Sequence, residues 1–169
     1  MNTDLYSFLS CSEKQTQRLG YALGACLRAG DVVLLEGEMG AGKSVLTRAA
    51  ARGMGVEGPV PSPTFTILNI HEGRAMRLYH FDLYRLEDAD ALYEMGLEEY
   101  IPAPDGASLI EWPQMAWEAM PADALLVEIR YEQDGLARSV ALTPMGAFDQ
   151  GRVDEILKTM EDCHEYPDD

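Results

Sequence analysis

The sequence predicts an α/β fold of three layers, in which helices cover both faces of a mixed parallel and antiparallel central sheet. A short continuous apolar run at 31–35 is typical of a parallel strand that is buried on both faces. Two antiparallel hairpins are predicted, one from segments 65–71 and 75–82 and the other from 124–131 and 136–143, because a short glycine-containing turn separates each pair. Apolar residues at helical spacing supply the outer layers.

Four helices are predicted from capping residues and apolar spacing. The first begins at a capping box formed by Ser12 and Gln15, and Gly30 is expected to end it. The limits expected for the other helices are Gly53 at the end of the second, Asp88 and Gly96 around the third, and residues 153–160 within the fourth.

Length and composition indicate a single globular domain. The chain has 169 residues, enough to bury a core without disulfides, and we expect one domain at 1–160 and a flexible acidic tail at 161–169. The 29 acidic and 13 basic residues give a net charge of −16, which argues against an extensive grip on DNA or RNA. Solubility and docking of a basic partner surface are both compatible with this acidity.

The cysteines and the apolar segments indicate the compartment. Cys11, Cys26 and Cys163 are odd in number and show no C-x-x-C spacing, so neither a disulfide framework nor a zinc site is expected. No stretch approaches the ~18 apolar residues of a membrane span, and no basic segment precedes an apolar run at the start of the chain. We therefore expect a cytoplasmic protein with no membrane partner.

Residues 37–44 read Gly-Glu-Met-Gly-Ala-Gly-Lys-Ser and fit the phosphate-binding pattern G-x-x-x-x-G-K-[ST]. The glycines let backbone N–H groups curl round a phosphate, Lys43 supplies positive charge to the β- and γ-phosphates, and the Ser44 hydroxyl can bind Mg²⁺. Because the pattern follows a buried strand and precedes a helix, it predicts a P-loop NTPase-like fold. The predicted nucleotide contacts are Glu38, Met39, Gly40, Ala41, Gly42, Lys43, Ser44, Val45 and Thr64.

Two further segments are candidates for nucleotide contact. Thr64 lies in the sequence Ser-Pro-Thr-Phe, within a connector rich in glycine and proline, where a threonine of a P-loop protein can sense the γ-phosphate and Mg²⁺. An ordinary Ser-Pro turn is the alternative. The polar residues 13–16 are expected to cap the surface of the first helix, and contact with an adenine base is the alternative.

Two carboxylates follow predicted strands, at the ends where open α/β sheets bind their ligands. Asp82 is predicted to orient the attacking water or to hold the water shell of magnesium, which makes Lys43 and Asp82 the predicted catalytic residues. Glu111 is predicted to hold Mg²⁺ together with Ser44. The alternative for each acid is a cap of the turn that follows it.

The expected roles of three side chains near these acids are less specific. His80 is expected to be a hydrogen-bonded structural histidine rather than a base, and Trp112 is expected to pack against the site. Arg85 either neutralises phosphate charge or forms a surface or interface ion pair.

With these motifs the chain resembles the TsaE family, the ATPase component of bacterial tRNA threonylcarbamoyladenosine biosynthesis. The resemblance is carried, in the order typical of the family, by the loop at 37–44, Ser-Pro-Thr-Phe at 62–65, His-Phe-Asp-Leu-Tyr-Arg at 80–85 and Leu-Ile-Glu-Trp-Pro at 109–113. It implies ATP as substrate, Mg²⁺ held by Ser44 and Glu111, and Asp82 required for hydrolysis. It also implies that Thr64 lies in a nucleotide-sensitive loop. Ser44 stands where threonine is usual, which keeps the hydroxyl.

The resemblance also implies partners. ATP hydrolysis would support turnover by TsaB and TsaD, which transfer a threonylcarbamoyl group to adenosine 37 of tRNA, so contact with tRNA would be indirect. A small-molecule kinase of the P-loop class and a nucleotide-dependent binding module are the alternatives. A GTPase is disfavoured, because a guanine-reading N-K-x-D segment needs Asn before Lys, and neither Asn2 nor Asn69 is followed by lysine.

Overall fold

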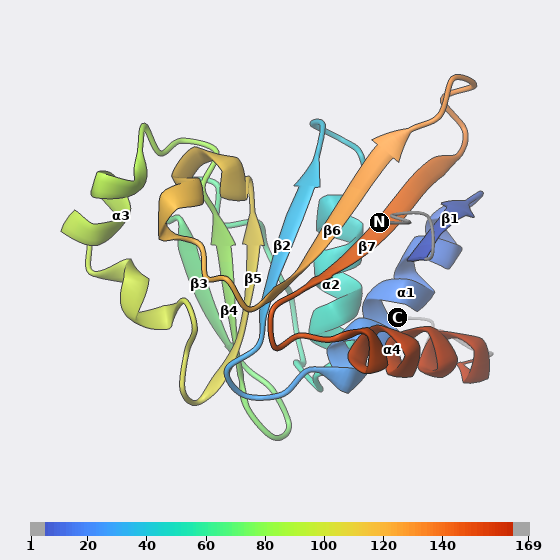
Figure 1. The fold of residues 1–169 in the computed structure, drawn as a ribbon, viewed down its shortest axis with the longest axis horizontal. Helices are drawn as coiled ribbons and strands as arrows, with labels where there is room; N and C mark the ends of the chain where they lie inside the picture. The colour runs from blue at the N-terminus through green and yellow to red at the C-terminus, as the bar shows by residue number, and fades with distance from the viewer. Residues whose placement is uncertain (1–5, 164–169) are drawn as a thin grey trace.

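The computed structural model describes residues 6–163, which fold around one seven-stranded sheet (Figure 1). The elements in chain order are β1 (Ser7–Ser10), α1 (Glu13–Cys26), β2 (Val32–Gly37), α2 (Lys43–Gly53), β3 (Leu68–Glu72), β4 (Arg77–Asp82), α3 (Ala89–Glu94), the 3-10 helix η2 (Leu97–Tyr100), β5 (Gly106–Glu111), the 3-10 helix η3 (Pro113–Ala119), β6 (Ala124–Tyr131), β7 (Arg138–Met145) and α4 (Gln150–Asp162).

The sheet is mixed, as the sequence predicts. Its strand order is β1-β7-β6-β2-β5-β4-β3. The four central strands β6, β2, β5 and β4 run parallel, while β3 pairs antiparallel with β4, and β7 pairs antiparallel with both β6 and β1. Both predicted hairpins are therefore confirmed. The parallel strands bring the carboxyl ends of β2, β4 and β5 to the same edge of the sheet.

Helices cover both faces of the sheet, which confirms the three-layer prediction. One buried cluster joins α1, α2 and α4 to the first face and includes Leu23, Leu46 and Ile156. A second cluster joins α3 and the two 3-10 helices to the opposite face and includes Phe81 and Leu92. No helix in residues 6–163 combines the length and apolarity that crossing a membrane requires.

Helices α1 and α2 are in backbone contact, which fixes the position of the helix that follows the glycine loop at 37–44. A Cβ added to Gly24 of α1 would lie 1.9 Å from the carbonyl oxygen of Ala50 in α2, and one added to Gly20 would lie 2.5 Å from that of Leu46. Only glycine allows this approach, because a side chain at either position would collide with the α2 backbone.

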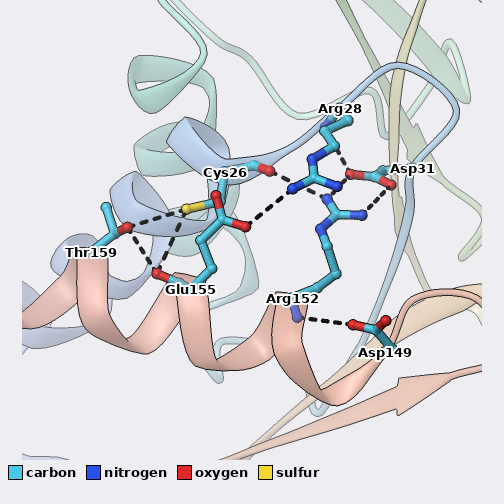
Figure 2. A network of polar contacts seen from close by, with 7 residues as sticks. All are labelled: Cys26, Arg28, Asp31, Asp149, Arg152, Glu155 and Thr159. Carbon is cyan, nitrogen blue, oxygen red and sulfur yellow. Dashed lines mark hydrogen bonds and ion pairs between the residues drawn. The ribbon is translucent and has the colours of Figure 1, made fainter.

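Helix α4 is fastened to the turn between α1 and β2 by a polar network (Figure 2). The Arg152 guanidinium donates to both carboxylate oxygens of Asp31, at 3.2 and 2.5 Å, and to the carbonyl of Cys26 at 3.3 Å. The Asp31 carboxylate raises the pKa of the Arg152 guanidinium. The neighbouring pair of Arg28 and Glu155 is much more exposed. Arg152 therefore carries most of this attachment.

The first helix is shorter than predicted. The Ser12 side chain accepts from the N–H of Gln15 as expected, but α1 ends at Cys26 rather than near Gly30. The reason is that Asp31 accepts the N–H of Arg28 at 2.7 Å, which removes that donor from the helical pattern. At the end of α2, Gly53 is the last helical residue and Gly55 takes the left-handed conformation (φ +84°).

The strands β3 and β7 begin later than predicted because turns occupy the residues expected at their starts. β3 begins at Leu68 rather than residue 65, since a turn closed by the N–H of Ile67 and the carbonyl of Pro63 occupies the preceding residues. β7 begins at Arg138 because the side chain of Asp134 accepts the N–H groups of the two following turn residues, 136 and 137. Strand β1 was not predicted. Helix α4 runs to Asp162, and residues 164–169 of the predicted tail lie outside the described residues.

Candidate functional site: a cavity at the carboxyl ends of three strands

The loop between β2 and α2 forms one wall of a cavity of about 510 Å³. The cavity is lined by residues at the carboxyl ends of β4 and β5 and by the loop that follows β2, and these three strands end at the same edge of the sheet (Figure 1). This is the edge where open parallel sheets bind their ligands. Nine of the predicted site residues line the cavity: Met39, Gly40, Gly42, Lys43, Ser44, Val45, Thr64, Asp82 and Glu111. Its other lining residues are Ser62, Tyr84, Arg85 and Trp112. The fold thus brings together segments from four separate parts of the chain.

The loop has the conformation that its glycines allow. Gly40 and Gly42 have φ of 78° and 115°, in the left-handed region, and α2 begins directly afterwards at Lys43. The first N–H groups of a helix have no partner within the helix, so the start of α2 presents donors and the positive end of its dipole to the cavity. This arrangement suits a phosphate group.

Lys43 lies at the floor of the cavity with 6% of its surface exposed. Its ammonium donates to the carbonyl of Gly37 at 2.6 Å and lies 3.6 Å from the centre of the Trp112 ring. Burial lowers the pKa of the Lys43 amino group, and the nearby carboxylates of Glu111 and Asp82 oppose that shift by favouring the charged form. The lysine is held in place, with its charge available to an anionic ligand.

Trp112 has an unusual backbone conformation that serves this contact. Its φ is +58°, a value that residues other than glycine rarely adopt, and the residue lies where the chain leaves β5. Its ring reaches the Lys43 ammonium and also contacts the Tyr84 ring, with centroids 4.9 Å apart. The expectation that Trp112 packs against the site is confirmed, and Tyr84 adds an aromatic wall that the sequence did not predict.

The two predicted carboxylates are neighbours. Asp82 ends β4 and Glu111 ends β5, and they are register partners in the parallel pair, so both side chains emerge on the same face. Both residues are buried, with 7% and 3% of their surface exposed. Two buried carboxylates side by side favour a cation between or beside them.

The hydrogen bonds of the two acids differ. Asp82 Oδ1 accepts the N–H of Tyr84 at 3.0 Å, so Asp82 does cap the following turn, and the residue also lines the cavity. Glu111 Oε2 lies 3.4 Å from Nε2 of the buried His80, the one hydrogen-bond partner of this carboxylate within residues 6–163. No bond of that carboxylate to the following turn occurs in this part of the chain. His80 is thus a hydrogen-bonded histidine, as expected.

The connector supplies the outer rim of the cavity. Thr64 and Ser62 line it, with their hydroxyls 3.2 Å apart. Phe65 is 82% exposed beside them, and the Arg85 guanidinium lies 4.4 Å from the centre of its ring. Arg85 has no ion pair among the described residues, so the predicted alternative of a surface ion pair within this chain is not observed.

Two predicted nucleotide contacts lie beside the main cavity instead of lining it. Glu38 faces a neighbouring hollow of about 410 Å³ with Glu36 and Glu128. Ala41 lines a smaller cavity of about 160 Å³ on the other side of the loop, together with Glu13 and Thr16 at the start of α1. The segment 13–16 therefore both caps α1 and borders the loop.

Tyr131 and Arg138 also touch the loop, and the sequence analysis missed them. Tyr131 donates to the carbonyl of Gly40, and Arg138 Nε donates to that of Ala41 at 3.1 Å. They come from the hairpin of β6 and β7, about ninety residues further along the chain. No local motif marks them, because only the sheet order brings that hairpin beside β2.

Comparison with known proteins identifies the family of this chain. Residues 10–140 match the model of the family described as "Threonylcarbamoyl adenosine biosynthesis protein TsaE". The chain belongs to the TsaE family. A TsaE protein of Bacillus subtilis is 35% identical over 79% of this chain and 82% of its own length, and one from a Nostoc species is 37% identical over 85% and 90%. The crystal structure of Bacillus subtilis YdiB superposes with a TM-score of 0.74 at 27% identity, covering 94% of this chain and 95% of that one.

Proposed function

We propose that this TsaE-family protein binds ATP with Mg²⁺ in the cavity at the carboxyl ends of β2, β4 and β5 and hydrolyses it. The observation that carries the proposal is the convergence of Lys43, Asp82 and Glu111 on one cavity beside a glycine loop and a helix N-terminus. The cavity supplies cationic and N–H groups for phosphates, and carboxylates for a metal ion and a water molecule.

The phosphates would be held by the loop and by the first turn of α2. Lys43 donates to the Gly37 carbonyl in the structure, and it would turn its ammonium toward the β- and γ-phosphates. The Trp112 ring beneath it keeps the ammonium near that position without neutralising it. The smaller cavity bordered by Glu13 and Thr16 lies beside the same loop and is the place we assign to the adenine base.

The oxygen groups of the cavity fit a magnesium ion. Mg²⁺ is usually held by one or two protein oxygens, the substrate phosphates and several waters. Ser44 and Glu111 would hold it directly, and the buried neighbouring carboxylates favour a cation there. A bound Mg²⁺ would neutralise charge that develops on the phosphates during transfer. His80 would keep the Glu111 carboxylate in position by its hydrogen bond.

Asp82 would position the attacking water. One of its oxygens accepts the Tyr84 N–H, and the other would accept a hydrogen bond from water in the cavity that Asp82 lines. Thr64 would sense the γ-phosphate from the rim. We propose that ATP turnover supports the threonylcarbamoyladenosine modification of tRNA together with TsaB and TsaD, in the cytoplasm. Contact with tRNA would be indirect.

Product analysis separates this proposal from a small-molecule kinase. The protein is incubated with ATP and Mg²⁺ without any acceptor, alone and with the TsaB and TsaD homologues of the same cell, with Lys43→Ala as the inactive control. Release of inorganic phosphate to water supports the ATPase. In a parallel incubation with small-molecule extract of the same cell, conversion of ATP to ADP with a phosphorylated metabolite and no inorganic phosphate supports the kinase. Nucleotide-dependent capture of TsaB and TsaD without any phosphate release would support a binding module. Besides Lys43, Arg85 is the one cationic lining residue among the described part of the chain, which favours water as acceptor.

A further inference from the structure

The hairpin of β6 and β7 extends past the carboxyl end of β2 and lies beside the glycine loop (Figure 1). Tyr131, the last residue of β6, and Arg138, the first of β7, are register partners across the hairpin. The Arg138 guanidinium stacks on the Tyr131 ring, 4.1 Å from its centre. The two side chains therefore act as one unit, which we call the hairpin clamp.

The hairpin clamp holds two successive carbonyl groups of the loop. Tyr131 Oη donates to the oxygen of Gly40, and Arg138 Nε donates to that of Ala41 at 3.1 Å. A Cβ on Gly40 would lie 2.9 Å from the Tyr131 hydroxyl, so the glycine leaves room for this contact. The loop is thus bound from outside the main cavity, by groups that do not line that cavity.

Fixing a carbonyl also fixes the next N–H, because the two point in opposite directions across a trans peptide. With the Ala41 oxygen held by Arg138, the N–H of Gly42 is turned away from the hairpin. The clamp also keeps two partly negative oxygens off the face that would receive phosphate. The N–H of Ala41 itself donates to the Glu38 carbonyl at 3.0 Å, so the N–H of Gly42 is the donor that the Arg138 contact orients.

Backbone pairing and side-chain hydrogen bonds hold the hairpin in place beside the loop. The backbone of Arg138 is paired with Tyr131 on one side and with Ser10 of β1 on the other. Its Nη1 also donates to the carbonyls of Gly135 and Ala137, at 3.2 and 3.3 Å. The Asp134 carboxylate closes the turn by accepting two backbone N–H groups, which lower the pKa of that carboxyl.

We propose that Tyr131 and Arg138 are positioning residues for phosphate binding, which hold the glycine loop in its anion-accepting form through the carbonyls of Gly40 and Ala41. This inference rests on the proposed nucleotide function and adds to it a pair of residues outside the loop. It assigns to the two contacts with the loop carbonyls a role in affinity for the phosphates and no role in hydrolysis. Arg138 also lines the smaller cavity assigned above to the adenine base, so the comparison of AMP with ADP is made in Tyr131→Phe.

The test measures nucleotide affinity by calorimetry, and by displacement of a fluorescent ADP analogue, in four variants of the full chain. Tyr131→Phe removes only the hydroxyl and keeps the ring under Arg138, and we expect ADP to bind about 3- to 10-fold more weakly. Arg138→Gln removes a charged donor, and we expect a loss of about 10- to 100-fold. Arg130→Gln is the matched control, because that neighbouring arginine is exposed and pairs with Glu128. It should bind ADP as the unaltered protein does.

Two readouts distinguish positioning from simpler roles. Arg138→Lys keeps the charge but not the Nε donor, so a positioning role predicts that it stays within about 3-fold of Arg138→Gln, whereas a role through charge alone predicts rescue. Tyr131→Phe should leave AMP binding unchanged, because AMP lacks the β-phosphate, and should unfold at a temperature close to that of the unaltered protein.

Normal ADP affinity in Tyr131→Phe and Arg138→Gln, rescue by Arg138→Lys, or equal losses for AMP and ADP would each overturn the inference. Failure of the unaltered protein to bind ADP at all would instead overturn the proposed function on which the inference rests. The two failures are therefore distinguishable.

Discussion

Replacing Glu111 by glutamine tests the proposed magnesium ligand, since the substitution removes one charge and keeps the size of the side chain. Glu111 and Asp82 are register partners on adjacent strands, which lie roughly 4.8 Å apart in a sheet. Two unit charges about 5 Å apart repel by about 3 kcal/mol at an effective dielectric constant of about 20. Lys43 attracts the same carboxylate, so Glu111→Gln also removes an attraction that opposes this repulsion.

These two electrostatic effects have opposite signs in the free protein. We therefore expect the free energy of unfolding of Glu111→Gln without Mg²⁺ to differ from that of the unaltered protein by less than about 1 kcal/mol. The requirement for magnesium should change far more. Loss of the carboxylate ligand should raise the Mg²⁺ concentration for half-maximal ATP binding by at least about 10- to 100-fold.

The assay is a magnesium titration of ATP binding by calorimetry, beside urea unfolding of the metal-free protein. Glu128→Gln is the control, because Glu128 lies in β6, pairs with the exposed Arg130 and does not line the main cavity. An unaltered magnesium titration would show that Glu111 is not a ligand. A loss of more than about 2 kcal/mol of stability with a normal titration would make the carboxylate a structural group held by His80.

Further predictions concern Lys43, Asp82 and Arg152. Lys43→Ala should weaken ATP binding at least about tenfold in calorimetry, because it deletes a charged donor to phosphate. In the unaltered protein, ATP affinity should fall as the pH rises through the Lys43 pKa, because only the charged form attracts phosphate. The midpoint of that fall should lie below the ordinary 10.5, because burial lowers the Lys43 pKa. Asp82→Ala should keep ATP affinity but slow phosphate release by at least about 10²-fold, and normal turnover with TsaB and TsaD would reject its catalytic role. Arg152→Met should lower the urea unfolding free energy by about 2 kcal/mol, whereas Glu155→Gln, whose ion pair with Arg28 is exposed, should lower it by less than about 1 kcal/mol, and equal losses would contradict the assignment of the attachment to Arg152.

The parts of the site that could be predicted are those with a local physical signature. The glycine loop is such a part, because a buried strand, the glycines at 40 and 42 and the start of a helix adjoin one another in the chain. Asp82 and Glu111 were predicted because each acid ends an apolar strand, where a carboxylate is rarely buried unless it has a partner or a ligand. The roles assigned to these residues stay predictions until the variants are measured.

The parts that could not be predicted depend on contacts between distant segments. The left-handed backbone of Trp112, which brings its ring to the Lys43 ammonium, has no counterpart in local propensity. The shortened α1 depends on a carboxylate that competes for one backbone N–H. Strand β1 is only four residues long and is stabilised as a strand by pairing with β7, which follows it by more than a hundred residues.

The sequence by itself determined the α/β class, the glycine loop, the two strand-end acids and the family, since each follows from short local motifs or from the order of those motifs along the chain. Only the tertiary structure decided that β4 and β5 are adjacent in a register that pairs Asp82 with Glu111, and that the hairpin of β6 and β7 reaches the loop. The physical reason is that strand order and register are set by long-range hydrogen bonding and burial across the whole sheet. A local pattern specifies which face of a strand is apolar, but it does not specify which strand lies beside it.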